Sequence, residues 1–258
     1  FYNPSALYRG GVNAKKKIDA ARKTLCLFFG SGYDAVFTSC GSEADNMAVF
    51  SFARRGNAVT DSGEHSAINN SFKELKNHGV ETRFASLNKN GSVNIDKLLE
   101  LIDEKTTFVS VVHVNNETGA INDVNAIAAL VKKKNPSVVF HADGVQGFLI
   151  IPFKPSKDID LYSVSAHKIC ALKGTGALVY RKGLHLHPLI IGGGQEGGLR
   201  SGTENLFGIK VFENAARERF DNLEENFKKA ENIKNYIENG LDKEIFSVLS
   251  GKKSSPYI

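Results

Sequence analysis

The sequence is poor in the features that mark several protein classes. Its 258 residues include three cysteines, one methionine and no tryptophan. Because Cys26, Cys40 and Cys170 are odd in number and widely spaced, they exclude a disulfide framework and a CxxC metal site and favour a reducing compartment. No apolar run approaches the roughly 18 residues that span a bilayer, and no charged and apolar leader opens the chain. We therefore expect a cytoplasmic protein with no membrane partner.

The charge is positive but has no pattern typical of nucleic-acid binding. The net charge is +5 and the pI about 9.0, yet the lysines are scattered over predicted helix faces. The run Lys132, Lys133, Lys134 lies at a helix end, where cations complement the helix dipole. No stripe of basic and aromatic residues accompanies it, so we expect no nucleic-acid partner.

The size of the chain suits one large α/β domain, or one domain with part of another. It is 41% hydrophobic and 24% charged, as ordinary globular proteins are. The sequence begins with Phe1 rather than Met and stops at Ile258, close to a possible strand start. We expect both ends of the protein to be missing from this sequence.

Strand and helix patterns alternate along the chain. Strands are expected at 35–38, 57–60, 80–85, 107–114, 138–141, 160–164 and 177–180. Helices are expected at 13–29, 42–54, 65–77, 95–102, 124–134 and 216–241. The apolar and β-branched run 107–114 suits a strand buried on both faces. The alternation predicts an α/β fold with three αβα layers around a mostly parallel sheet.

The end of the chain predicts a second unit. Residues 1–215 would form the large domain. Residues 216–258 would form a linking helix and the start of a small α+β C-terminal domain, with a strand beginning at 244–249.

Polar residues follow several of the predicted strands. In mostly parallel sheets, ligands bind at the carboxyl ends of the strands, so residues far apart in sequence can converge there. These residues are Gly41, Ser42, His65, Asn115, Asn116, Glu117, Asp143, Gln146, Ser165, His167 and Lys168. Each alone is a common turn or cap residue. Together they predict one site with an anion-binding loop, an acid and a lysine.

Two of these positions have an ordinary alternative. Ser42 with Asp45 resembles a helix capping box, but the small residues before Ser42 also leave backbone N–H groups free to hold a phosphate. Burial after an apolar strand would lower the pKa of Lys168, as a Schiff-base lysine needs, whereas a surface turn would leave it solvated. The residues alone leave both questions open.

Hydrolase and metal chemistry fit less well. Asp143, His167 and Ser165 could be imagined as a triad, but the chain has no GxSxG elbow. The H-x-D at 141–143 and the H-x-H at 185–187 have no further metal ligands at a recognisable spacing.

The long glycine-rich loop at 191–203 contains a formal GxGxxG match at Gly192, Gly194 and Gly197. No βαβ context or later ribose-binding acid accompanies it, so it does not predict a dinucleotide site. A phosphate loop, an acid and a lysine without a metal set instead favour pyridoxal phosphate.

The same motifs support a more specific interpretation. They are T-S-x-x-S-E-x-D-N at 38–46, E-H-x-A at 64–67, H-V-N-N-E-T-G at 113–119, H-x-D-x-x-Q at 141–146, S-x-H-K at 165–168, K-G-x-G-A-L at 173–178, G-G-Q-E at 193–196 and R-S-G-T at 200–203. With these motifs in this order, the chain resembles the cysteine desulfurases of the class V aminotransferase family, which are pyridoxal phosphate-dependent enzymes of fold type I. It is similar to the bacterial iron–sulfur cluster and nitrogenase-type branch.

The resemblance implies roles for individual residues. Lys168 would form the Schiff base with the cofactor and later move protons, and His65 would stack on the ring; both are expected catalytic residues. Asp143 would pair with the pyridinium nitrogen, and Asn116 and Gln146 would bond to the ring oxygen. The remaining expected cofactor-binding residues are Gly41, Ser42, Ser165 and His167 at the phosphate, Ala166 within the same lysine segment, and Thr203, which would reach the cofactor of the other subunit of a homodimer.

The implied activity is removal of sulfur from L-cysteine to give L-alanine and an enzyme persulfide. The persulfide would pass to an iron–sulfur scaffold or another sulfur acceptor. The alternatives are a selenocysteine lyase, a small-molecule aminotransferase, or a non-catalytic scaffold that retains the fold.

The chain also departs from the family pattern. Cys40 stands where the family usually has glycine, Ser42 replaces threonine, and Ala-Leu at 171–172 replaces Gly-Pro. The family's persulfide-forming cysteine lies on a loop of the small domain, which we expect beyond Ile258. The three cysteines of this chain are therefore expected to be structural, and the fragment could be inactive by itself.

Overall fold

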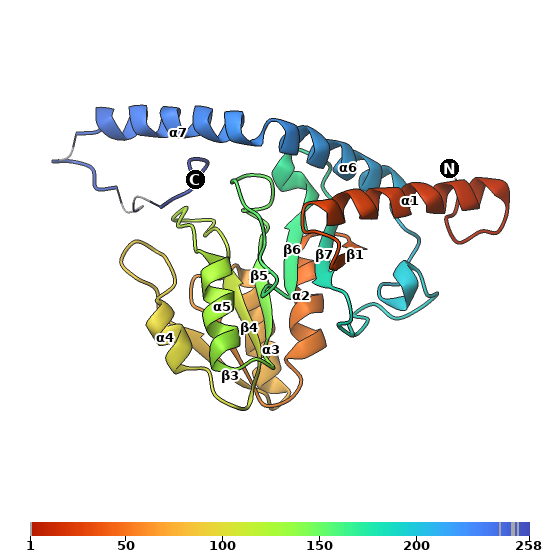
Figure 1. Cartoon of the computed structure of the whole chain (residues 1–258), viewed down its shortest axis with the longest axis horizontal. Helices are drawn as coiled ribbons and strands as arrows, with labels where there is room; N and C mark the ends of the chain where they lie inside the picture. The colour runs from red at the N-terminus through yellow and green to blue at the C-terminus, as the bar shows by residue number, and fades with distance from the viewer. Residues whose placement is uncertain (1, 243, 249–250, 252) are drawn as a thin grey trace.

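A computed structural model describes residues 2–242, 244–248, 251 and 253–258. Within them, seven strands form one sheet in the order β1-β7-β6-β5-β4-β2-β3. The strands are β1 (Tyr33–Thr38), β2 (Asn57–Asp61), β3 (Glu81–Ala85), β4 (Thr106–Val112), β5 (Val139–Asp143), β6 (Leu161–Ser165) and β7 (Gly176–Arg181). Strand β7 is antiparallel to both of its neighbours, and the other neighbouring strands are parallel. The predicted mostly parallel sheet is confirmed (Figure 1).

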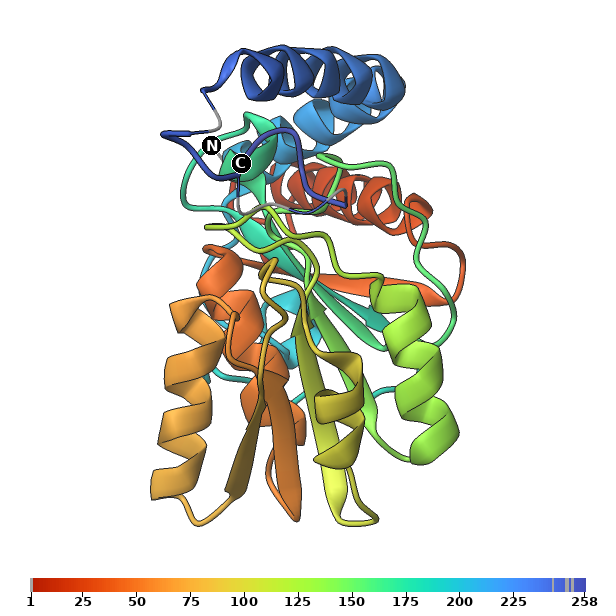
Figure 2. The same ribbon diagram turned by 90° about the vertical axis from the view of Figure 1, so that its left-hand side faces the viewer.

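Helices cover both faces of this sheet. They are α1 (Arg9–Leu27), α2 (Gly41–Phe52), α3 (Ser66–Asn77), α4 (Ile95–Glu100), α5 (Val124–Lys134), α6 (Leu206–Asp221) and α7 (Leu223–Gly240), with short 3₁₀ helices η1 (Ala166–Ile169) and η2 (Glu196–Gly198). One apolar cluster packs α2 and α3 on one face, and a second packs α1, α4, α5 and α6 on the other. Figure 2 shows α2 and α3 on one side of the strands and α4 and α5 on the other. The three-layer αβα prediction is confirmed.

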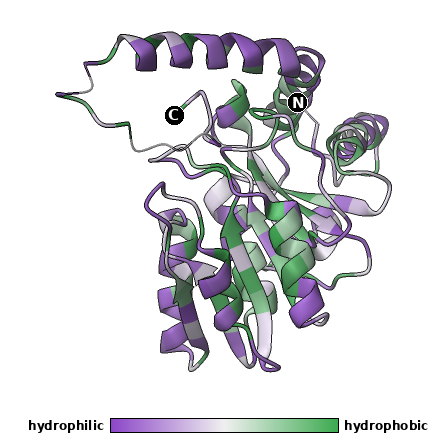
Figure 3. Cartoon of the chain, turned by 60° about the vertical axis from the view of Figure 1, so that its left-hand side comes forward, coloured by the Kyte–Doolittle hydropathy of each residue, from purple (hydrophilic) through white to green (hydrophobic). Residues whose placement is uncertain are grey.

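The hydropathy pattern explains this layering. In Figure 3, hydrophobic residues occupy the strands and the inner faces of the helices, and hydrophilic residues occupy the outer faces. Phe108, Phe140 and Tyr162, on neighbouring central strands, are fully buried. Helix α7 is different because none of its residues is fully buried: Leu223 and Phe227 pack partly against the core, and Ile233 and Tyr236 are exposed.

The prediction of one helix over 216–241 is wrong. The structure has two helices, α6 and α7, and α6 begins ten residues before the predicted start. The Asn205 side chain caps α6 by accepting a hydrogen bond from the Gly208 N–H at 3.0 Å. Asn222 lies between the helices with φ −112° and ψ 11°, which breaks the helical path.

The strand expected at 244–249 is also not found. Residues 244–248 form a turn and irregular chain, and Leu249 lies outside the described residues. The proposed domain boundary at 215 and 216 would fall inside α6 and stays a prediction.

The last described residues contact the loop that follows β4. The Ile121 N–H donates to the Lys253 carbonyl at 3.1 Å, and the Ser255 N–H donates to the Gly119 carbonyl at 2.7 Å. Figure 1 shows this segment returning beneath α7. Across the described ranges, we find no helix with the length and apolar character needed to cross a bilayer.

Candidate active site

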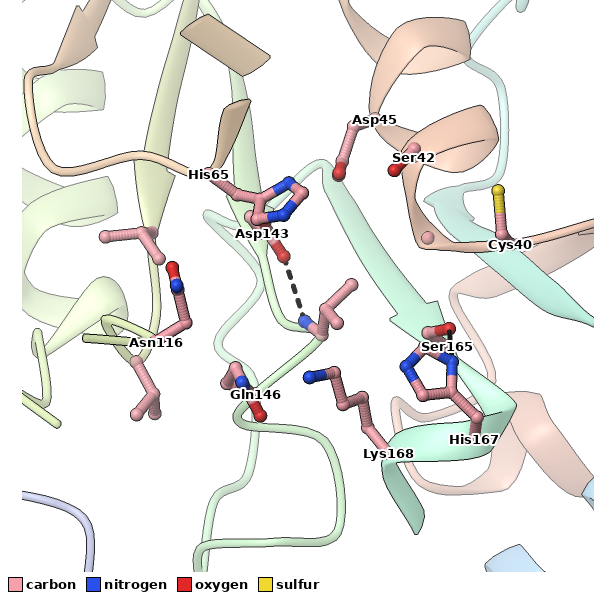
Figure 4. Close-up of a pocket in the computed structure, with 14 residues that line it drawn as sticks. Cys40, Ser42, Asp45, His65, Asn116, Asp143, Gln146, Ser165, His167 and Lys168 are labelled. Carbon is pink, nitrogen blue, oxygen red and sulfur yellow. Dashed lines mark hydrogen bonds between the residues drawn. The ribbon is translucent and has the colours of Figure 1, made fainter. Parts of the chain in front are cut away.

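A cavity of about 340 Å³ lies at the carboxyl ends of the central parallel strands. Its volume falls in the range of small-ligand pockets. All expected cofactor-binding residues except Ala166 and Thr203 line it, whereas Asn115 and Glu117 of the strand-end group do not: the lining residues are Gly41, Ser42, His65, Asn116, Asp143, Gln146, Ser165, His167 and Lys168. Figure 4 shows these side chains converging from separate strand ends. The convergence expected from the sheet topology is therefore found.

Ala166 and Thr203 lie elsewhere. Ala166 is fully buried in the apolar core at the start of η1, and its side chain does not reach the cavity. Thr203 is exposed and lines a separate hollow together with Ser39 and Arg200. Within one subunit, Thr203 is not part of the site.

The N-terminus of α2 forms one wall of the cavity and has no capping side chain among the described residues. Of the two alternatives left open for Ser42 and Asp45, the capping box is therefore not found. Glu43 instead accepts a hydrogen bond from the Ser39 N–H at 2.8 Å and pairs with Arg200, also at 2.8 Å. The first turn of α2 thus keeps N–H groups for an anion, which the helix dipole also attracts.

Gly41 fits this wall because a larger residue would not. A Cβ atom at Gly41 would lie 2.6 Å from Val145 Cγ2 and 3.4 Å from Ser165 Cβ. Gly176 is similarly constrained, since its Cβ would lie 2.7 Å from the carbonyl carbon of Cys40. Glycine at both positions lets the backbone close tightly around the start of α2.

Ser165, at the end of β6, and His167, on η1, face the start of α2. The Ser165 hydroxyl lies 3.0 Å from His167 Nδ1, within hydrogen-bond distance. Partial burial lowers the pKa of His167, and the neighbouring Lys168 and Lys173 lower it further. The neutral ring can exchange hydrogen bonds with Ser165 while its other nitrogen remains available to a ligand.

Asp143 ends β5 and carries the acid of the site. Its Oδ1 accepts a hydrogen bond from the Val145 N–H at 2.9 Å, which fixes the carboxyl (Figure 4). Burial raises the pKa of Asp143, while the Val145 N–H, His65 and Lys168 lower it and so partly oppose burial. A cationic group entering the cavity would favour the carboxylate form further.

Lys168 lies on η1, and Figure 4 shows its amine pointing into the cavity beside Gln146. Its side chain is partly buried, between the buried lysine and the solvated turn that the sequence left open. The amine is accessible to a ligand in the cavity.

His65 begins α3 and lies above Asp143 in Figure 4. Its Nδ1 accepts a hydrogen bond from the Ala67 N–H at 3.1 Å. This bond occupies Nδ1, so Nε2 remains available to a ligand in the cavity. The ring is therefore held in one orientation as both a helix cap and a wall of the site.

Sequence reasoning missed part of the lining. The additional residues are Cys40, Asp45, Val112, Val114 and Val145. Asp45 is 1% exposed, and its Oδ1 has no hydrogen-bond partner among the described residues. Its position one helical turn after Gly41, on the face of α2 toward the sheet, is the signal that could have revealed it.

The rival chemistries find no support in the geometry. Asp143 bonds to the Val145 backbone, and no hydrogen bond to His167 is present. No cluster of three His, Cys, Asp or Glu side chains suited to a metal occurs in the described ranges. The 191–203 loop is irregular but anchored, since Glu196 pairs with Arg22 at 2.7 Å and accepts the Phe37 N–H at 2.7 Å.

Comparison with known sequences gives a consistent family. Residues 2–254 match the aminotransferase class-V family. A cysteine desulfurase from Nostoc sp. is 34% identical over 245 residues, and cysteine desulfurase IscS from Clostridium botulinum is 36% identical over 262 residues. These alignments cover 93% and 98% of this chain but 61% and 65% of the two relatives. The chain thus spans less than two thirds of the length of these relatives.

Solved structures share the fold. A NifS-like protein has a TM-score of 0.93 at 34% identity, covering 98% of this chain and 72% of that protein. DndA from Streptomyces lividans has a TM-score of 0.89 at 28% identity, covering 98% of this chain and 75% of that protein. The resemblance inferred from the motifs is confirmed over nearly the whole chain, which belongs to the class-V aminotransferase family.

Proposed function

We propose that this chain is the cofactor-binding part of a pyridoxal phosphate-dependent cysteine desulfurase. The observation that carries the proposal is a single cavity in which an uncapped helix N-terminus, a buried acid and a lysine amine meet. The names of the relatives from Nostoc sp. and Clostridium botulinum support cysteine desulfurization in particular.

The donor set fits pyridoxal phosphate. The start of α2 provides free N–H groups, and Gly41 lets this helix start pack closely against Val145 and Ser165. Ser42, Ser165 and His167 would add hydrogen bonds to the phosphate oxygens. Asp143 would pair with the ring nitrogen and His65 would face the ring, as expected from the family resemblance.

When bound, pyridoxal phosphate supplies an electron sink for negative charge that develops at the substrate α-carbon. Asp143 would hold a proton on the ring nitrogen, because a buried carboxylate stabilises a positive charge beside it. Lys168 would hold the cofactor covalently and, once released, would carry a proton to or from the substrate α-carbon. Asn116 and Gln146 would orient the ring through hydrogen bonds.

Cysteine is the proposed substrate. A similar structure, 31% identical with a TM-score of 0.78 over 84% of this chain and 65% of its own, is described as SspA in complex with cysteine. In our proposal the whole protein releases L-alanine and transfers sulfur as a persulfide to an iron–sulfur scaffold or another acceptor. We further propose a cytoplasmic homodimer in which Thr203 reaches the partner's cofactor.

The test uses the full-length protein loaded with pyridoxal phosphate. We expect L-alanine and sulfide from L-cysteine with a reductant, and we expect Lys168→Ala to abolish both products. Lys173→Ala is the matched control, because Lys173 is an exposed lysine on the following turn that does not line the cavity. Activity with selenocysteine but not cysteine would favour a selenocysteine lyase. Failure to bind the cofactor would favour a non-catalytic scaffold.

A further inference from the structure

A chain of polar side chains is buried directly beneath the cavity. Side chains alternate between the two faces of a strand, so residues two apart share a face. Val112, Asp143 and Ser165 line the cavity at the ends of β4, β5 and β6. Ser110, His141 and Ser163 lie two residues earlier on the same three strands and are fully buried.

Short contacts join this second row. The Ser163 hydroxyl lies 2.9 Å from His141 Nε2, and the Ser110 hydroxyl lies 2.9 Å from His141 Nδ1. The Ser110 hydroxyl also donates to Glu64 Oε1 at 2.7 Å. Burial lowers the pKa of His141 to about 3, so the ring is neutral and carries a single proton.

A carboxyl group lies at each end of the row. Glu64 is 5% exposed, and its Oε2 has no hydrogen-bond partner in the described part of the chain. At the other end, Asp45 lines the cavity, and its Oδ1 lies 3.8 Å from His141 Nε2, beside the Ser163 hydroxyl. This distance is too long for a hydrogen bond, so Asp45 connects to the row through Ser163, whose hydroxyl interacts with the Asp45 carboxyl and opposes the rise in its pKa.

Two buried carboxyls without a paired cation are not both ionised, because desolvation strongly disfavours the charged form. We propose that Asp45, Ser163, His141, Ser110 and Glu64 form a proton relay that shares one proton between the cavity and the buried Glu64. The relay itself follows from the contacts above. Its role rests on the proposed function, since the cation that would shift the proton from Asp45 to Glu64 is the protonated cofactor ring.

The transfer balances without moving charge onto the imidazole. With the proton on Asp45, Asp45 donates to Ser163, Ser163 to His141 Nε2, His141 Nδ1–H to Ser110, and Ser110 to the Glu64 carboxylate. In the transfer, each of these groups passes one proton to the next. Glu64 then holds the proton, Asp45 is a carboxylate, and His141 has changed from the Nδ1–H to the Nε2–H tautomer.

Asp45 and Glu64, at the two ends of the relay, are influenced by the charges of different neighbouring carboxyls. The largest Coulombic effect on Asp45 comes from Asp143, and the largest on Glu64 comes from Asp61. Repulsion from an ionised Asp143 therefore favours the proton on Asp45, and repulsion from an ionised Asp61 favours it on Glu64. A cation beside Asp143 would let Asp45 ionise and send the proton to Glu64, adding a second negative charge to the cavity wall.

The test is ¹⁵N NMR of the cofactor-free protein with labelled histidine, in which protonated and unprotonated ring nitrogens have well-separated shifts. In the wild type, we expect the Nδ1–H tautomer of His141. Asp143→Asn should shift the population to Nε2–H, and Asp61→Asn should leave it at Nδ1–H. Ser163→Ala, which breaks the relay, should abolish the response to Asp143→Asn. His113 is the internal reference, because it is also buried, with a pKa of about 3, and does not contact the relay.

An unchanged His141 tautomer in Asp143→Asn, or a response that survives Ser163→Ala, would overturn the relay. Thermal unfolding of each variant identifies any that fails to fold. Adding pyridoxal phosphate to the wild type should move the tautomer in the same direction as Asp143→Asn. Binding seen by absorbance without that movement would overturn the role of the relay. Absence of binding would count against the proposed function and leave the variant test of the relay intact.

Discussion

Arg200 Nε lies 2.8 Å from Glu43 Oε1 and holds this first-turn acid of α2 away from the cavity wall. Burial opposes ionisation of Glu43, but hydrogen bonds from Arg200 and Ser39 outweigh it and lower the pKa of Glu43. The pair joins the start of α2 to the 191–203 loop. It also keeps a negative charge out of the place where we propose that phosphate binds.

Arg200→Gln should loosen this connection. We expect a loss of about 1 to 3 kcal/mol in the free energy of unfolding, as for other hydrogen bonds to charged groups. Phosphate affinity should also fall, because the Glu43 charge is no longer neutralised. Because folding lowers the pKa of Glu43, its carboxylate stabilises the folded protein above the usual carboxyl pKa, and this stabilisation is lost as the pH falls through the lowered pKa. The difference in the free energy of unfolding between variant and wild type should therefore shrink as the pH falls. Lys97→Gln, which breaks an exposed pair, should leave the stability almost unchanged.

Gly41→Ala tests the tight wall of the cavity. The new Cβ would lie 2.6 Å from Val145 Cγ2, so we expect overpacking to cost about 1 to 3 kcal/mol of stability. The affinity for inorganic phosphate and for pyridoxal phosphate should fall with it, as measured by calorimetry. Gly32→Ala is the control, because its Cβ would meet nothing within 4 Å. Equal phosphate affinity in both variants would contradict the proposed location of the anion site.

Asp143→Asn should weaken cofactor binding while leaving the cavity in place. Loss of one charge-assisted hydrogen bond is worth about 1.5 to 3 kcal/mol, or roughly a 10- to 100-fold increase in Kd. A fluorescence titration with pyridoxal phosphate measures the change. The same replacement at the exposed Asp221 should leave the Kd unchanged. If both variants bind as tightly as the wild type, Asp143 does not contact the ring nitrogen.

The buried carboxyls predict how stability depends on pH. Burial raises the pKa of Asp61 to about 7 and also raises those of Asp45, Glu64 and Asp143. Such groups bind more protons when folded, so their contribution is full below the unfolded pKa of about 4 and is lost as the pH rises through the folded pKa. The Tm of the cofactor-free protein should therefore fall between about pH 4 and 7, and Asp61→Asn should flatten that slope. A Tm that rises through this range would show that these groups are ionised.

Local sequence signals were sufficient for much of the fold. Residues 124–134 were predicted as a helix and form α5, because the Asp123 side chain caps its start and three lysines occupy its last turn. Most of the polar residues expected at strand ends also meet in the cavity, although Asn115 and Glu117 do not, since the carboxyl ends of parallel strands share one edge of a sheet.

The remaining features depend on distant partners. Glu43 pairs with a residue 157 positions away, so the local S-x-x-D pattern could not decide between a capping box and an anion site. Asp45 was read as a partner of that cap, although its carboxyl lies over His141, which comes from another strand. The break at Asn222 was missed because apolar residues recur at helical spacing on both sides of it.

The most direct test of the account is to reduce the cofactor-loaded full-length protein with borohydride and to map the modified peptide by mass spectrometry. We predict that the pyridoxyl phosphate mass lies on the peptide containing Lys168, at about one group per chain, and that Lys168→Ala loses it while Lys173→Ala keeps it. Modification spread over exposed lysines, or retained in Lys168→Ala, would contradict the proposed cofactor site.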